Sequence, residues 1–320
     1  MRNDHFLQSE SLDFGRLVPM DTKRIAVAGS SGLIASRTIP YLEAAGWKVL
    51  RLVRRPARHG GERTWDPRAA MSPGLLEGCG AVLNLCGHSI SDWPWTRSTR
   101  RAIRTSRVET TSALARVARQ SGVGVFINGS AMGFYGNRGD LHVPETTAGG
   151  GGFLAEVCRD WEEALSPLQG SATRVVALRT GIVLSSRGGS LPPQWNAWRR
   201  GLGAILGSGE QWIPWIHLED AARAIVHVLE DHGSHGAVNL CSPTPVRQRE
   251  FSKSLDSLSG STTRLKVPAW LLAGLLGDFA RELLLSGQRG VPELLSGSGF
   301  SWNHPDLRDA LEGIRSELSQ

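Results

Sequence analysis

The segment Gly29-Ser30-Ser31-Gly32-Leu33-Ile34-Ala35 follows a short apolar run, Arg24–Ala28, and opens a stretch with helical spacing. Gly29 suits a tight turn and Gly32 lets the backbone approach a diphosphate, while a helix amino end offers free N–H groups and a positive dipole end. We predict that Gly29, Ser30, Ser31, Gly32, Leu33 and Ile34 cradle the diphosphate of a dinucleotide. The alternative is an incidental glycine-rich turn.

The end of the next predicted strand, 48–53, indicates which dinucleotide binds. A site that prefers NAD carries an acidic residue about 20 residues after the loop, where it holds the ribose 2′-hydroxyl. Here no acidic residue lies between Glu43 and Glu62, and the strand runs into Arg54 and Arg55. Guanidinium groups at this point suit a 2′-phosphate. We therefore predict NADP(H), with Arg54 as the first contact; the alternative for one of the pair is a plain surface residue.

Proton transfer is harder to assign, because the chain has only two tyrosines, Tyr41 and Tyr135, and four lysines. Many reductases that use nicotinamide carry a tyrosine four residues before a lysine, which lowers the pKa of the phenol. Neither tyrosine here has a lysine at that spacing, and no lysine lies between Lys48 and Lys253. The usual proton-donating pair is therefore missing.

The elements that position these residues alternate along the chain. Apolar strand-like runs alternate with helical patterns, which predicts βαβ units and an α/β fold with a doubly wound parallel sheet. The predicted strands are 24–28, 48–53, 81–85, 123–128, 174–178 and 237–240, and the predicted helices are 33–45, 98–121, 155–168 and 220–229.

Two stretches interrupt the alternation. The segment 185–216 is rich in Gly, Pro and Trp, and 246–320 is mostly helical with Pro and Gly between the helices. We predict a dinucleotide-binding domain from 22–184 and 220–245, and a smaller substrate or cap region from 185–219 and 246–320, packed over the carboxyl edge of the sheet. Residues 1–21 are expected to be a disordered extension, with Met20 as a second candidate start.

Composition limits the partners. The 320 residues are 40% hydrophobic with a net charge of +6, and the basic excess is concentrated between Arg51 and Arg119. Because these arginines are not interleaved with aromatic residues, we expect a solvated helix face or a phosphate-bearing small ligand, and no nucleic acid. Four scattered cysteines indicate buried thiols in a reducing cytoplasm and no metal site. No apolar run reaches membrane-spanning length, so no membrane partner is expected. A homodimer is an open alternative.

Several motifs, read in order, make the chain resemble a known family. They are the glycine loop, Ala81-Val82-Leu83-Asn84-Leu85-Cys86-Gly87, Gly129-Ser130-Ala131-Met132-Gly133-Phe134-Tyr135-Gly136, Cys158-Arg159-Asp160-Trp161-Glu162, Leu178-Arg179-Thr180-Gly181-Ile182-Val183-Leu184, Gln211-Trp212-Ile213-Pro214-Trp215-Ile216-His217 and Leu285-Ser286-Gly287-Gln288-Arg289. Over about 23–313 the chain is similar to the epimerase-like branch of the atypical short-chain dehydrogenase/reductases. The resemblance implies a Rossmann fold that binds NADP(H), with Leu85, Cys86 and Gly87 along the cofactor, a substrate cleft above the nicotinamide and a short C-terminal helical domain. Ala35 and Phe134 depart from the family pattern.

The remaining candidates face an unidentified small substrate. Ser130 matches the serine that contacts a substrate carbonyl or hydroxyl in related proteins, and Tyr135 is either a proton donor or a contact or packing residue. Arg179 either binds an anionic substrate group or forms a structural salt bridge. Trp212, Trp215 and His217 either wall a ligand or form a packed aromatic lid, and Glu162 is expected to face solvent or to pair with Arg159. We predict an oxidoreductase or epimerase that acts on a small hydroxy or carbonyl compound, or else an NADPH-binding sensor or scaffold without turnover.

Overall fold

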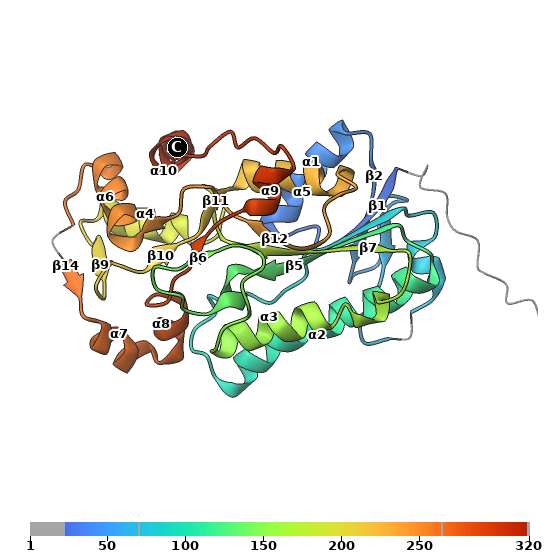
Figure 1. Ribbon diagram of the computed structural model, residues 1–320, viewed down its shortest axis with the longest axis horizontal. Helices are drawn as coiled ribbons and strands as arrows, with labels where there is room; N and C mark the ends of the chain where they lie inside the picture. The colour runs from blue at the N-terminus through green and yellow to red at the C-terminus, as the bar shows by residue number, and fades with distance from the viewer. Residues whose placement is uncertain (1–22, 70, 264, 319–320) are drawn as a thin grey trace, which may run out of the picture.

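A twisted parallel sheet forms the centre of the computed structural model, which describes residues 23–69, 71–263 and 265–318 (Figure 1). Seven strands are ordered β12-β7-β5-β4-β1-β2-β3, and every neighbouring pair is parallel. The predicted doubly wound sheet is confirmed. The expectations for 1–21 and Met20 lie outside the described residues.

The strands of this sheet begin close to the predicted positions. They are β1 (Arg24–Ala28), β2 (Lys48–Val53), β3 (Glu62–Thr64), β4 (Ala81–Asn84), β5 (Val125–Ala131), β7 (Arg174–Thr180) and β12 (Gly236–Leu240). Edge strand β3 is the one strand of this sheet that the sequence reading misses, because its three residues, Glu-Arg-Thr, are polar and too few to show a period.

Helices cover both faces of the sheet (Figure 1). Successive side chains of β1 point to opposite faces. Ile25 and Val27 pack with α1 (Leu33–Ala44) and α5 (Leu218–Glu230), whereas Ala26 and Ala28 pack on the side of α2 (Arg97–Gln120). Helix α3 (Phe153–Glu163) lies beside α2 on that second face. Short 3₁₀ turns complete the layer: η1 (Pro73–Leu76), η2 (Met132–Tyr135) and η3 (Ser166–Leu168).

The remaining elements gather at one end of the sheet (Figure 1). The helices are α4 (Leu191–Arg199), α6 (Gln248–Ser259), α7 (Ala269–Leu276), α8 (Asp278–Leu283), α9 (Glu293–Gly297) and α10 (Leu307–Leu318). The strand pairs are β8 (Ile182–Leu184) with β11 (Trp215–His217), β9 (Ala204–Leu206) with β14 (Leu265–Val267), β10 (Trp212–Ile213) with β13 (Val246–Arg247), and β6 (His142–Val143) with β15 (Arg289–Gly290).

The two chain segments beyond the sheet share one hydrophobic core. Trp195, Trp198 and Trp215 pack there against Phe251 and Leu311, with Leu184, Leu191, Leu255, Leu258, Leu307, Ala310 and Ile314 completing the cluster. Segments 185–219 and 246–320 thus bury many of their apolar side chains together, whereas Ile216, Leu295 and Phe300 pack in the core of the sheet. We call this unit the cap. Among the described residues, no helix has the combined length and apolar character needed to cross a bilayer.

Candidate functional site

The turn after β1 approaches the end of β4 so closely that only glycine fits at its first position. Gly29 has a φ of +77°, and a Cβ added there would lie 2.8 Å from the carbonyl oxygen of Leu85. The N–H of Gly32 donates to the Gly29 carbonyl at 2.9 Å, which closes the turn just before α1 begins. The predicted loop and the Leu85-Cys86-Gly87 segment therefore lie side by side at the carboxyl edge of the sheet.

The amino end of α1 keeps its free N–H groups. Its N-cap residue, Gly32, has no side chain to accept from them, and the first turn holds no acidic residue. Ser31 and Gly32 are exposed, and Ser30, Leu33 and Ile34 are half-buried. An uncapped helix start with a positive dipole end suits an anionic group. This is the arrangement that a diphosphate requires.

The two arginines after β2 have different surroundings. Arg55 donates two hydrogen bonds to the carboxylate of Glu62 on β3, at 2.6 and 2.7 Å. Arg54 is exposed. Burial raises the pKa of the Cys86 thiol to about 11, and the positive charge of Arg54 opposes this rise. Arg54 therefore lies near the end of β4 with its charge available, whereas Arg55 is already held by an internal partner.

A buried polar network joins Ser130, Tyr135 and Arg179. Ser130 donates from Oγ to Oε1 of Glu162 at 2.7 Å, and Arg179 reaches the same carboxylate through Nε at 2.9 Å and Nη2 at 2.8 Å. Arg179 Nη1 also donates to the Tyr135 hydroxyl at 2.9 Å. Glu162 thus pairs with Arg179 and neither faces solvent nor pairs with Arg159, so Arg179 has the structural role and is not free for a substrate anion.

Tyr135 is poorly placed to donate a proton to a substrate. The side chain is fully buried, and its hydroxyl donates to Oδ1 of Asn239 at 2.7 Å while accepting from Arg179. Burial raises the pKa of this phenol to about 12, although Arg179 acts in the opposite direction. The geometry therefore favours the packing role for Tyr135, because both hydrogen-bonding functions of its hydroxyl are used internally.

The aromatic candidates separate into core and surface. Trp215 is fully buried in the cap core and donates from its indole N–H to the Thr244 carbonyl, so it walls no ligand. Trp212 is half-buried under the guanidinium groups of Arg247 and Arg289, each 4.6 Å from its ring.

His217 caps a helix. Its Nδ1 accepts from the Glu219 N–H at 3.2 Å, so His217 is the N-cap of α5, which begins at Leu218 and not at the predicted position 220. Ligand atoms of His217, Glu219 and His304 lie within 4.8 Å of one another, close enough for a metal ion by distance alone. An Nδ1 that accepts an N–H leaves the proton of the neutral ring on Nε2. The hydrogen bonding of His217 therefore opposes metal ligation.

A cavity of about 150 Å³ opens beyond the end of β5. It lies between the Gly133 and Gly136 backbone, Leu154 of α3, and Glu282 and Gln288 of the cap. The Glu282 carboxylate accepts from the N–H groups of Phe153 at 2.7 Å and of Leu154 at 3.1 Å. Glu282 of the cap thus accepts the free N–H groups at the start of α3, and the cap forms one wall of this cavity.

The structure adds four residues to this edge. No role was predicted from the sequence for Arg107, Asn239 or Glu282, and a different surrounding was predicted for Glu162. Only Arg107 carries a signal, because it lies at helical spacing from the buried residues Ile103 and Leu114 and thus places a charge on an apolar face. The partners of the others are distant along the chain: Tyr135 and Asn239, for example, are 104 positions apart.

Comparison with known proteins gives the family. The model described as "NAD dependent epimerase/dehydratase family" matches residues 25–152 and 173–241. The chain belongs to this family. A second model, a domain of unknown function called DUF1731, matches 267–314, which covers α7 to most of α10 in the cap.

Relatives match over nearly the whole chain. Epimerase family protein Mb2239 of Mycobacterium bovis is 41% identical over 288 residues, covering 90% of this chain and 96% of the relative. The crystal structure of human epimerase family protein SDR39U1 (isoform 2) with NADPH has a TM-score of 0.84 at 28% identity, covering 92% of this chain and 100% of the human one. MoeE5 in complex with UDP-glucuronic acid and NAD has a TM-score of 0.74 at 21% identity, covering 92% and 98%, and supports the fold alone. The predicted resemblance is confirmed.

Proposed function

We propose that this protein binds NADP(H) across the carboxyl edge of its sheet. The observation that carries the proposal is the pairing of a glycine-only turn at Gly29 with an uncapped start of α1, a cradle that a Cβ would fill. The backbone of 29–34 would hold the diphosphate and Arg54 the 2′-phosphate. Leu85, Cys86 and Gly87 would lie along the dinucleotide. The human relative crystallised with NADPH adds support.

We further propose an oxidoreductase or epimerase that acts on a small hydroxy or carbonyl compound. Bound NADP(H) supplies or accepts a hydride. The cavity beyond β5 offers space for a small molecule past the end of the strand that carries Ser130, whose Oγ already donates to Glu162. A substrate hydroxyl can pass its proton to the Ser130 oxygen while the Ser130 proton moves to the Glu162 carboxylate. Arg179 holds that carboxylate in place, so Ser130 and Glu162 replace the missing tyrosine and lysine.

A specific observation favours a second function, an NADPH-binding sensor or scaffold without turnover. Tyr135 is fully buried and Ser130 is only 4% exposed, so neither hydroxyl reaches a substrate without movement. In that case the liganded protein would be recognised by a partner, and bound NADPH would not be consumed.

One experiment separates these functions. Calorimetric titration with NADPH and NADH measures cofactor binding, and absorbance at the reduced-nicotinamide band follows consumption with a panel of small carbonyl compounds. Tight NADPH binding with consumption that Ser130→Ala abolishes supports the enzyme, and tight binding with no consumption supports the sensor. If NADH binds as tightly as NADPH, the NADP(H) assignment is wrong.

We also propose that the protein works in the reducing cytoplasm on a small molecule, without nucleic acid or membrane partners, and a homodimer is part of this proposal. The cysteines support the compartment, since all four are free thiols and three of them are buried.

A further inference from the structure

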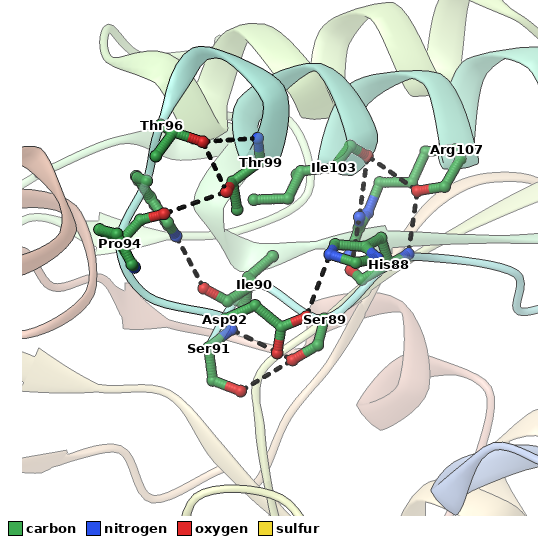
Figure 2. Close-up of polar contacts among 12 residues, drawn as sticks. His88, Ser89, Ile90, Ser91, Asp92, Pro94, Thr96, Thr99, Ile103 and Arg107 are labelled. Atoms are coloured by element: carbon green, nitrogen blue, oxygen red, sulfur yellow. Dashed lines mark hydrogen bonds and ion pairs between the residues drawn. The ribbon is translucent and has the colours of Figure 1, made fainter.

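Arg107 extends from α2 toward the loop that follows β4. Its Nη1 donates to the His88 carbonyl at 3.0 Å and to the Ile103 carbonyl at 2.9 Å, as Figure 2 shows. The guanidinium lies against Gly87, where an added Cβ would be 3.1 Å from its central carbon. Beneath it is the Trp161 ring, 5.0 Å away. The group thus sits at the carboxyl edge of the sheet, beside one of the predicted cofactor-binding residues.

No carboxylate compensates this charge. Among the described residues, none lies within 4.0 Å of the Arg107 guanidinium, whereas Arg104 and Arg100 on the same helix pair with Asp160 and Asp278. Burial lowers the pKa of Arg107, and no carboxylate acts against this. Arg107 is half-buried, and a partly desolvated charge without an ion-pair partner costs stability.

The hydrogen-bonding capacity of Arg107 is also incomplete. Within the described part of the chain, its Nε and Nη2 donate to no acceptor. Arg174 provides the contrast, because its Nη1 donates to the carbonyls of Val228 and Ser234 and its Nη2 to that of Leu229. Arg174 is a structural arginine, since both of its terminal nitrogens donate to backbone carbonyls. By contrast, Nε and Nη2 of Arg107 have no acceptor within the described residues, and they lie at an edge where a ligand is expected.

We infer that Arg107 is a ligand-binding residue whose Nε and Nη2 receive an anionic oxygen, from a phosphate or a carboxylate, of a molecule bound at this edge. The inference rests on the proposed binding of NADP(H). Arg54 follows β2, and Gly87 follows β4 on the far side of β1. Arg107 therefore approaches this edge from the β4 side of β1, and Arg54 approaches it from the β2 side. The anion that Arg107 binds is either the cofactor diphosphate or an acidic group of the substrate.

The test compares Arg107→Met with Arg104→Met, which removes an exposed charge that pairs with Asp160 from the same helix. Calorimetry measures binding of NADPH, of 2′-phospho-ADP-ribose and, in the NADPH-saturated protein, of inorganic phosphate. Thermal unfolding of the ligand-free protein is the second measurement. We expect Arg107→Met to leave the melting temperature of the ligand-free protein unchanged or to raise it. We also expect it to weaken the binding of one probe by at least roughly tenfold, the usual effect of a lost charged hydrogen bond. Arg107→Lys retains the charge and should bind better than Arg107→Met.

The pattern of losses identifies the anion. Equal weakening of NADPH and 2′-phospho-ADP-ribose assigns Arg107 to the diphosphate. Loss of inorganic phosphate binding alone assigns it to an acidic substrate group. Unchanged binding of all three probes overturns the inference, and a lower ligand-free melting temperature in that case makes Arg107 structural. If the wild-type protein does not bind NADPH, the proposed function fails separately, and inorganic phosphate still tests Arg107 in the ligand-free protein.

Discussion

The guanidinium of Arg179 and the carboxylate of Glu162 form a two-point ion pair that joins the carboxyl end of β7 to α3, with N–O distances of 2.9 and 2.8 Å. Both side chains are largely removed from water, at 7% and 18% exposure. Breaking a buried pair leaves an uncompensated charge, which costs about 3 kcal/mol. We expect Glu162→Gln to lower the free energy of unfolding by about that amount in urea titrations.

The exposed pair of Arg308 and Glu312 on α10 provides the control for this change. Glu312→Gln should cost less than about 1 kcal/mol, since surface pairs contribute little. Equal effects of the two variants would contradict a structural role for the Arg179–Glu162 pair.

Removal of the Tyr135 hydroxyl should weaken the fold and leave cofactor binding unchanged. Tyr135→Phe deletes an acceptor of a charged hydrogen bond and a donor to Asn239, so we expect a loss of about 1 to 3 kcal/mol in unfolding free energy. Tyr41→Phe is the matched control, because that hydroxyl donates to Glu219 in a less buried place and should cost less. A large fall in turnover with no change in stability would restore the proton-donor role.

Arg54 and Arg55 should contribute unequally to the choice of dinucleotide. Arg54→Ala removes the available charge and should weaken the binding of NADPH by roughly tenfold or more, while the binding of NADH changes little. Arg55→Ala should have the smaller effect on this preference, because Arg55 is held by Glu62. Calorimetric dissociation constants for both cofactors measure the two effects. A larger loss in Arg55→Ala would reverse the assignment.

His217 makes stability depend on pH below neutrality. Burial first, and His304 second, lower its pKa to about 4. Between pH 6.5 and 4 the unfolded chain therefore takes up a proton that the folded chain does not, so stability is complete above about pH 6.5 and falls as the pH decreases. The loss is roughly 2 to 3 kcal/mol and stops near pH 4.

His217→Asn keeps a helix-capping side chain and removes the titration. We expect the variant to flatten the slope of unfolding free energy between pH 6.5 and 4, as measured by urea titrations across that range. His232→Asn, at an exposed position, should keep the wild-type slope. An unchanged slope in His217→Asn would show that other groups cause the pH dependence.

Glu282 should stabilise the contact between the cap and α3. Glu282→Ala removes the acceptor for the N–H groups of Phe153 and Leu154, and loss of a helix cap costs about 1 kcal/mol. Melting temperature and the urea midpoint should both fall. Glu156→Ala, an exposed change within the first turn of α3, is the control. A smaller loss in Glu282→Ala than in Glu156→Ala would argue against this capping role.

The sheet was predictable because each principal strand is a compact apolar run. β2 has the predicted bounds, and β1 ends at Ala28, directly before the glycine that forces the turn. Helix α5 begins at Leu218, two residues before the predicted position, because a histidine side chain serves as its cap. Local composition therefore gives the elements, and unusual capping shifts a boundary.

The polar partners at the site were not predictable from chain order. Glu162 and Arg179 are separated by 17 residues and meet only because α3 packs beside β5 and β7. The same holds for Trp215: the sequence left open a ligand wall or a packed aromatic lid, and the pairing of β11 with β8 turns the side chain into the cap core. Such pairings depend on tertiary packing, which a single sequence does not specify.

The shared core of the cap also determines when folding of the chain can be completed during synthesis. Trp195, Trp198 and Trp215 are translated long before Leu311 and Ile314, which cover the same cluster. On the ribosome these indoles remain partly uncovered until α10 has emerged, although the strands from β1 to β7 are already complete. A chain that stops before α10 would therefore leave an aromatic surface open to aggregation.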